Sequence, residues 1–188
     1  MTVLYLYYNQ PSAIAFFESL GYDKLDIDFL FIDDGSKIPL KVDWADVIRI
    51  DKDVAWNQPV CNNIGFEAIH GDCLRMDIDH YFLAEDLKKI NNIKVGVNEI
   101  VTFKRESLHP HPNIFMCRPQ DVLNAGGYNE SFAGNYGYDD VELMKRLKRE
   151  GFTFTECPIE VKVNRGLERH GLKRDFSVNK AKYEKGNY

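Results

Sequence analysis

Phe29-Leu30-Phe31-Ile32-Asp33-Asp34-Gly35-Ser36 is the stretch of sequence that decides the fold. Consecutive apolar residues that end in carboxylates and a glycine are typical of a short strand covered on both faces, as in a parallel sheet. Further strand-like segments lie at residues 3–7, 47–50 and 73–76. Helical patterns that begin at Pro11 and Pro59 lie between some of these segments. The alternation predicts an α/β protein whose residues 1–80 form a parallel, doubly wound half-sheet.

The second half, residues 93–165, has a different pattern. Strands are expected at residues 93–97, 99–104, 113–117, 153–156 and 159–163, and a short helix at residues 121–124. A longer helix is expected from Asp139 to a stop at Gly151, because apolar residues recur between them at helical spacing. Residues 166–188 form a basic, polar tail that we expect to close over a bound substrate as a lid. The whole chain, residues 1–188, is expected to be one domain with a mixed sheet flanked by helices.

Charge and composition exclude several classes of partner. The net charge is −5, without a basic stripe, so nucleic acid is not an expected partner. No apolar run approaches the roughly 20 residues of a membrane span. The four cysteines lack the paired spacing of a metal site and are expected to be buried thiols in a reducing compartment. We therefore expect a cytoplasmic protein.

Polar residues follow three of the predicted strands, and in open α/β sheets ligands bind beyond the carboxyl ends of the strands. These residues are Tyr8 and Asn9, Asp33 and Asp34, and Asp77 and Asp79. Carboxylates spaced two residues apart in an extended segment point to the same face and repel each other unless a cation lies between them. Mg²⁺ and Mn²⁺ prefer oxygen ligands, so Asp77 and Asp79 indicate a divalent metal site, with a solvated turn as the alternative.

Motifs in a particular order resemble the catalytic domain of GT-A glycosyltransferases of the family 2 type. They are Ile32–Ser36, Trp56–Pro59 with Asn62–Gly65, Gly71-Asp72 leading to Asp77–Asp79, Gly126–Gly134, and Tyr136–Leu143. The last block is also similar to the C-terminal segment of galactosyltransferases, and the resemblance spans roughly residues 3–170. The chain departs from the family at Cys61-Asn62-Asn63-Ile64-Gly65, where Ala-Arg-Asn-x-Gly is usual, so a basic contact to the nucleotide is missing. The short loop after Ser36 suits a minimal enzyme of phage, viral or bacterial type.

The resemblance implies a GT-A (Rossmann-like) fold and a metal-dependent inverting transfer. A sugar would move from a nucleoside-diphosphate sugar, with uridine the expected nucleoside, to a hydroxyl of a glycan or other acceptor. The donor-binding residues it implies are Tyr8, Asn9, Asp33, Asp34, Asn63, Arg75 and Asp77. The ligands it implies for Mn²⁺ or Mg²⁺ are Asp79, Asp77 and His170. Asp140 would be the general base, and the acceptor-binding residues would be Gly127, Tyr128, Tyr138 and Asp139.

Structural roles are the alternative for several of these residues. Asp33 has the residue type and position of a turn cap. Asp139 and Asp140 begin a helix, where carboxylates favour capping and the helix dipole. For Arg75 the alternative is a packing role, and for His170 it is simple exposure to solvent in the tail. His109 and His111, flanked by prolines, are expected to be structural, and strand alternation predicts that His80 points away from Asp79.

Three other functions compete with glycosyl transfer. A phosphatase of the haloacid dehalogenase type also has Asp-x-Asp at a strand end, but it continues with Gly-Thr or Gly-Val rather than His80-Tyr81. A sugar-nucleotide nucleotidyltransferase needs a basic, glycine-rich loop after its first strand, where this chain has Tyr8-Asn9-Gln10-Pro11. A non-catalytic scaffold that binds a sugar or nucleotide in a degenerate site is the third alternative.

Overall fold

The computed structural model describes residues 1–106, 109–167 and 171–186. Within them, the main sheet has the strand order β3-β2-β1-β4-β7-β6-β8. Its strands are β1 (Thr2–Tyr7), β2 (Asp28–Asp34), β3 (Asp46–Ile50), β4 (Cys73–Met76), β6 (Glu99–Lys104), β7 (Phe115–Cys117) and β8 (Thr153–Glu160). A small second sheet pairs β5 (His80–Tyr81) with β9 (Lys162–Val163). The helices are α1 (Pro11–Ser19), α2 (Gln58–Ala68), α3 (Ala84–Ile90), α4 (Pro119–Asn124), α5 (Asp139–Arg149) and α6 (Ser177–Lys185).

The direction of the strands changes at the middle of the main sheet. β1 is parallel to β2 and β4, and β2 is parallel to β3. β7 is antiparallel to both β4 and β6, whereas β8 is parallel to β6. A parallel half-sheet joined to a mixed half confirms the predicted α/β class with a mixed sheet flanked by helices.

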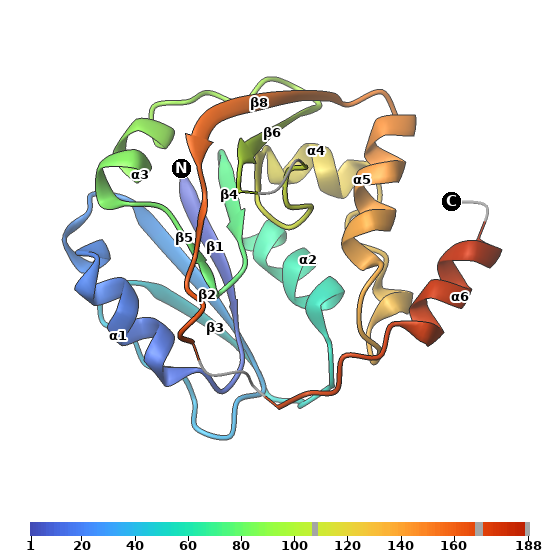
Figure 1. Ribbon diagram of the computed structural model, residues 1–188, viewed down its shortest axis with the longest axis horizontal. Coiled ribbons are helices and arrows are strands. Elements are labelled where there is room, and N and C mark those ends of the chain that lie inside the picture. Colours follow the sequence, from blue (N-terminus) through green and yellow to red (C-terminus); the bar gives the residue numbers. More distant parts are fainter. Residues whose placement is uncertain (107–108, 168–170, 187–188) are drawn as a thin grey trace.

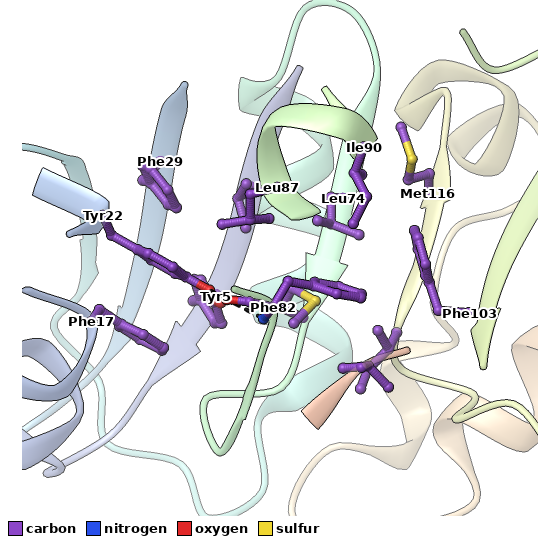
Figure 2. Packing of buried hydrophobic residues seen from close by; sticks show 14 of the residues in the cluster. Tyr5, Phe17, Tyr22, Phe29, Leu74, Phe82, Leu87, Ile90, Phe103 and Met116 are labelled. Carbon is purple, nitrogen blue, oxygen red and sulfur yellow. Dashed lines mark hydrogen bonds between the residues drawn. The ribbon is translucent and has the colours of Figure 1, made fainter. Parts of the chain in front are cut away.

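Helices cover both faces of the sheet and form two separate cores. In Figure 1, α1 and α3 lie on one side of the strands, and α2, α4 and α5 lie on the other. Alternate residues of β1 serve the two cores: Tyr5 packs on the α1 side and Leu4 on the α2 side. Figure 2 shows the α1 side, where aromatic rings from β1, α1 and the following turn pack together. Burial on both faces explains the uninterrupted apolar pattern of β1 and β2.

Two sequence-based expectations about the second half were wrong. Residues 93–97 do not form a strand, because the chain leaves α3 in a turn in which Ile93 N donates to Ile90 O. The strands expected at residues 153–156 and 159–163 are largely one, because β8 continues through Pro158. β8 lies at the edge of the sheet, where a proline without an N–H is tolerated.

Two helices were not expected from the sequence. α3 has acidic residues in its first turn and lysines in its last, which favours a helix through its dipole. α6 lies in the tail, beside α5 (Figure 1). The Lys145 ammonium of α5 lies above the Tyr183 ring of α6. Among the described residues, no helix has both the length and the apolar character of a membrane span.

Candidate active site

A cavity of about 690 Å³ lies beyond the carboxyl ends of β1, β2 and β4. Residues predicted for the site that line it are Tyr8, Asp34, Arg75, Asp77, Asp79, Tyr138, Asp139 and Asp140. The first five lie within the parallel strands β2 and β4 or in the segments that directly follow β1 and β4, and the N-terminus of α5 with the residue before it supplies the rest. The structure therefore brings carboxylates from both halves of the chain to one cavity.

Asp77, Asp79 and His80 form a compact group of potential metal ligands. One ligand atom from each lies within 4.8 Å of the others. β4 ends at Met76, and His80 N donates to Asp77 O at 2.9 Å, so these residues form a turn rather than an extended strand. Strand alternation does not apply there, and the prediction that His80 points away from Asp79 was wrong. His80 Nδ1 lies 2.7 Å from Asp79 Oδ1.

The chemistry of this group fits Mn²⁺ or Mg²⁺. Carboxylate oxygens suit both ions, and an imidazole nitrogen suits transition ions such as Mn²⁺. Burial acts to raise the pKa of Asp79, but its hydrogen bond with His80 and further hydrogen-bonding and electrostatic contributions outweigh it, so the pKa lies below its usual range. Asp79 is therefore ionised at neutral pH, as a metal ligand must be. His170 lies outside the described residues.

Arg75 forms the floor of the cavity. Its side chain is fully buried; its guanidinium contacts Asp77 Oδ1 and donates to Asn62 Oδ1 on α2 and to Asn113 O, both at 2.9 Å. Nη2 of Arg75 has no hydrogen-bond partner in the described part of the chain. The positive charge of this buried guanidinium offsets the repulsion between the carboxylates that line the cavity.

Asp139 and Asp140 are the first residues of α5, after Tyr138 in the left-handed conformation with φ 68°. Asp140 accepts from Val141 N at 2.7 Å through Oδ1 and from Asn113 Nδ2 at 3.2 Å through Oδ2. Asp139 is buried, and its Oδ2 has no partner among the described residues. Burial, and next the charge of Asp140, raise the pKa of Asp139 to about 7. Burial also raises the pKa of Asp140.

Asp33 and Asp34 have separate roles although they are adjacent. Asp33 is fully buried, pairs with Arg49 at 2.6 Å and accepts from the backbone N–H groups of Ser36 and Leu40. Burial acts to raise the pKa of Asp33, but the hydrogen bonds from Ser36, Leu40 and Arg49 outweigh it and hold the pKa below its usual range. Asp33 therefore caps the turn, and only Asp34 faces the cavity. Asp34 accepts from Asn57 Nδ2 at 2.9 Å.

Asn9 does not line the cavity either. It has φ 51°, and its side chain accepts from Lys37 N at 2.9 Å, while its backbone N donates to Ser36 Oγ. These contacts tie the turn after β1 to the turn after β2. Asn9 thus has a structural role in this turn and the neighbouring Tyr8 lines the cavity, while the donor contact of Asn9 stays a prediction.

Asn63, Gly127 and Tyr128 also lie away from the cavity. Asn63 Oδ1 accepts from Tyr128 N at 2.7 Å, and its Nδ2 donates to Tyr128 O at 2.9 Å. A Cβ on Gly127 would lie 2.6 Å from Asn63 Oδ1, so the glycine is needed for this contact. Tyr128 is buried, and its hydroxyl donates to Asn113 Oδ1 at 3.1 Å. These motif residues link the two halves of the chain and do not line the cavity, and their ligand contacts stay a prediction.

The tail forms one wall of the cavity. Trp56 Nε1 donates to Lys173 O at 2.9 Å, and the rings of Trp56 and Tyr136 lie 4.5 Å apart. Asn179 of α6 is fully buried and donates to three backbone carbonyls of the loop before α5. Arg174 of the tail and the preceding Arg165 line the cavity and give this wall positive charge.

Comparisons with known proteins identify the fold. No family model and no curated protein sequence matches this chain. Among solved structures, S. aureus TarS superimposes with a TM-score of 0.63 at 12% identity, over 84% of this chain and 35% of TarS. The chain has the GT-A fold. GalNAc-T7 with UDP, GalNAc and Mn²⁺ matches this GT-A chain with a TM-score of 0.63 at 10% identity, over 86% of this chain and 42% of that one.

A third GT-A neighbour is the 1–349 fragment of S. aureus TarS in complex with UDP-GlcNAc. Its TM-score is 0.62 at 12% identity, over 91% of this chain and 59% of the fragment. The chain thus spans less than two thirds of the length of each of these neighbours. At such low identity the likeness establishes the architecture of the chain and not its activity.

Sequence reasoning missed the part that His80 and Asn113 play in the site. For His80 the signal was present, because a ligand-type residue directly follows Asp77-Ile78-Asp79. For Asn113 the sequence has no comparable signal, since its contacts to Arg75, Tyr128 and Asp140 come from three distant segments.

Proposed function

We propose that this chain is a metal-dependent inverting glycosyltransferase that moves a sugar from a nucleoside-diphosphate sugar, with UDP the expected nucleotide, to a hydroxyl acceptor. One observation carries the proposal: in a GT-A fold, a single cavity holds both the Asp77–Asp79–His80 group and the carboxylates at the start of α5. The neighbours solved with UDP-GlcNAc, or with UDP, GalNAc and Mn²⁺, support a UDP-sugar donor and Mn²⁺.

The donor would lie over the carboxyl ends of β1, β2 and β4. Asp34 faces the cavity with an oxygen suited to accept from the N–H of a uracil ring. Asp79 and His80, with Asp77 beside them, would hold the metal, which neutralises the negative charge of the leaving diphosphate. Arg75 lies beside Asn62, the position at which the resembling family usually has arginine, so β4 supplies the cation that α2 lacks.

The acceptor would enter from the α5 side of the cavity. Asp140 would remove the proton from the acceptor hydroxyl as its oxygen forms the new bond to the anomeric carbon. As that bond forms, the bond from the anomeric carbon to the diphosphate oxygen breaks, and the nucleoside diphosphate leaves with the electron pair. Tyr138 lines this side, and its ring offers an apolar face on which a sugar can stack. Asp139 would accept a hydrogen bond from an acceptor hydroxyl through its unpartnered Oδ2.

Binding of the donor nucleotide tests the first half of this proposal. We expect UDP to raise the melting temperature in the presence of Mn²⁺ and much less in EDTA, because Asp77, Asp79 and His80 would hold the ion and its positive charge would attract the diphosphate. The Asp79→Ala variant should lose the dependence on Mn²⁺, whereas Asp140→Asn should keep it. The absence of a shift with any nucleotide would instead favour the non-catalytic scaffold. The anomeric configuration of the product, read by NMR, tests inversion.

A further inference from the structure

Asn113 is a buried residue that lies between Asp77 of the potential metal ligands and Asp140 of α5. Its backbone N–H and C=O and both ends of its side-chain amide each have a hydrogen-bond partner. It is 6% exposed, lines the cavity and precedes β7. Its backbone O accepts from Arg75 Nη1 at 2.9 Å, and its backbone N donates to His111 Nδ1 at 3.2 Å. Its side chain accepts from the Tyr128 hydroxyl at 3.1 Å and donates to Asp140 Oδ2 at 3.2 Å.

These contacts fix which end of the amide faces Asp140. The Tyr128 hydroxyl can act as donor or acceptor, but an ionised carboxylate can only accept. If the amide were flipped, its oxygen would face the carboxylate oxygen of Asp140 and the two would repel. The orientation with Asn113 Nδ2 toward Asp140 is therefore the stable one while Asp140 is ionised. The Tyr128 hydroxyl supports it by donating to Asn113 Oδ1.

The same residue ties the two halves of the site together. Arg75 contacts Asp77 as well as Asn113 O, so the chain of contacts runs from Asp77 through Arg75 and Asn113 to Asp140. Each link is buried or half-buried. Asn113 thus links the potential metal ligands to the carboxylates at the start of α5 through hydrogen bonds.

We propose that Asn113 is a positioning residue that orients Asp140 and favours its ionised form by donating a hydrogen bond to Oδ2. Other groups also act on Asp140: Asp77 and Asp139 oppose its charge, Val141 N donates to its Oδ1, and Arg75 attracts it. Its own backbone N–H also favours the charged form, and Tyr128 interacts with it electrostatically. Hydrogen bonds to a carboxylate favour the charged form, and that of Asn113 joins the one from Val141. Its part in catalysis rests on the proposed function, whereas its effect on Asp140 does not.

The test measures the titration of Asp140 by carbon-detected NMR of the carboxyl groups. An Asp139→Asn background is used, because neighbouring carboxyls otherwise titrate as a coupled pair. We expect Asn113→Ala to raise the pKa of Asp140 by about 1 to 2, the size of a lost hydrogen bond to a charged group. Tyr128→Phe should raise it by less, because the amide stays but is no longer held. Tyr22→Phe is the matched control, since it removes another buried tyrosine hydroxyl, one that donates to Phe82 O in the distant core.

A second variant covers the case in which Asn113→Ala does not fold. Asn113→Asp keeps the shape of the side chain but places a carboxyl against Asp140, so the pair should retain one proton to well above the usual range. A folded Asn113→Ala or Asn113→Asp variant in which Asp140 titrates as in the parent would overturn the proposal. So would a Tyr22→Phe variant that raises the pKa as much as Tyr128→Phe does.

The pH profile of donor turnover separates this proposal from the proposed function. The acidic limb of the profile should move to higher pH in Asn113→Ala by the same amount as the pKa, so turnover at a pH below the midpoint of that limb in the parent should fall roughly 10-fold or more. If the titration shifts but no nucleotide sugar is consumed, Asn113 positions Asp140 and the proposed function fails. If donor is consumed but neither the titration nor the profile shifts, the proposed function stands and the role of Asn113 fails.

Discussion

Asp139→Asn should stabilise the protein, and increasingly so as the pH rises. The carboxyl is only 5% exposed, and its Oδ2 has no partner among the described residues. Burial and the neighbouring charge of Asp140 raise its pKa from the usual 3.8 to about 7. An unfolded chain gives up this proton near its usual pKa, but the folded protein holds it to about pH 7. The folded state therefore binds more protons between these values, and it loses stability as the pH rises through this window.

The size of the effect follows from the difference between the two pKa values. A difference of about 3 corresponds to about 4 kcal/mol of unfolding free energy, at roughly 1.4 kcal/mol for each unit. Asparagine has the same shape and no charge, so Asp139→Asn should match the parent below pH 4 and exceed it by up to about 4 kcal/mol at pH 8. For a domain of this size such a gain raises the melting temperature by roughly 10 °C.

Urea denaturation at intervals from pH 4 to pH 8 measures this difference. Asp46→Asn is the control, because Asp46 is exposed at the start of β3 and its charge is solvated. A stability difference for Asp139→Asn that is constant across this pH range would refute the reasoning, as would a loss of stability at pH 8. A gain would indicate that the carboxylate is retained for function at a cost in stability.

Three further predictions concern packing, metal binding and the tail. Gly65→Ala should cost about 1–3 kcal/mol in urea denaturation, because a Cβ there would lie 2.6 Å from Leu4 Cδ1. In a Leu4→Ala background, which lacks the clashing atoms, the same substitution should cost less, and an equal cost in both backgrounds would contradict this reasoning. His80→Ala should weaken Mn²⁺ binding in calorimetric titration by roughly 10-fold or more. Replacement of the exposed His70 by alanine is the control and should leave the affinity unchanged. Equal Mn²⁺ affinities of His80→Ala and the wild type would rule out His80 as a ligand. Asn179→Ala should make residues 171–186 more susceptible to limited proteolysis, because it removes three hydrogen bonds to the loop before α5. An unchanged cleavage pattern would mean that other contacts hold the tail in place.

The first half of the fold could be predicted from the sequence because its strands are buried on both faces. Phe29–Ile32 alternates between the two cores, so every residue is apolar and the signal is strong. Residues 93–97 have apolar positions at strand spacing, but only Val95 is buried and the segment has no neighbouring strand. Short segments of this kind are decided by tertiary contacts rather than by local pattern.

The candidate site could be predicted where it depends on strand ends and not where it depends on turns. Asp34 and Asp77 reach the cavity because parallel strands end at one edge of the sheet. His80 was misplaced because the chain turns immediately after β4, which strand alternation ignores. Asn63 and Tyr128 belong to recognisable motifs, yet they contact each other, and a motif alone does not reveal whether a residue faces a ligand or another motif.

Turnover of nucleotide sugars tests the central claim most directly. The full chain is incubated with Mn²⁺ and a panel of UDP sugars, with and without simple glycosides as acceptors, and released UDP is measured. We expect the wild type to release UDP from at least one donor in a reaction that EDTA stops. Asp140→Asn should lose at least about 99% of this activity, the scale of a general base, while it still binds UDP. Equal UDP release by Asp140→Asn, or none from any donor by the wild type, would contradict the account.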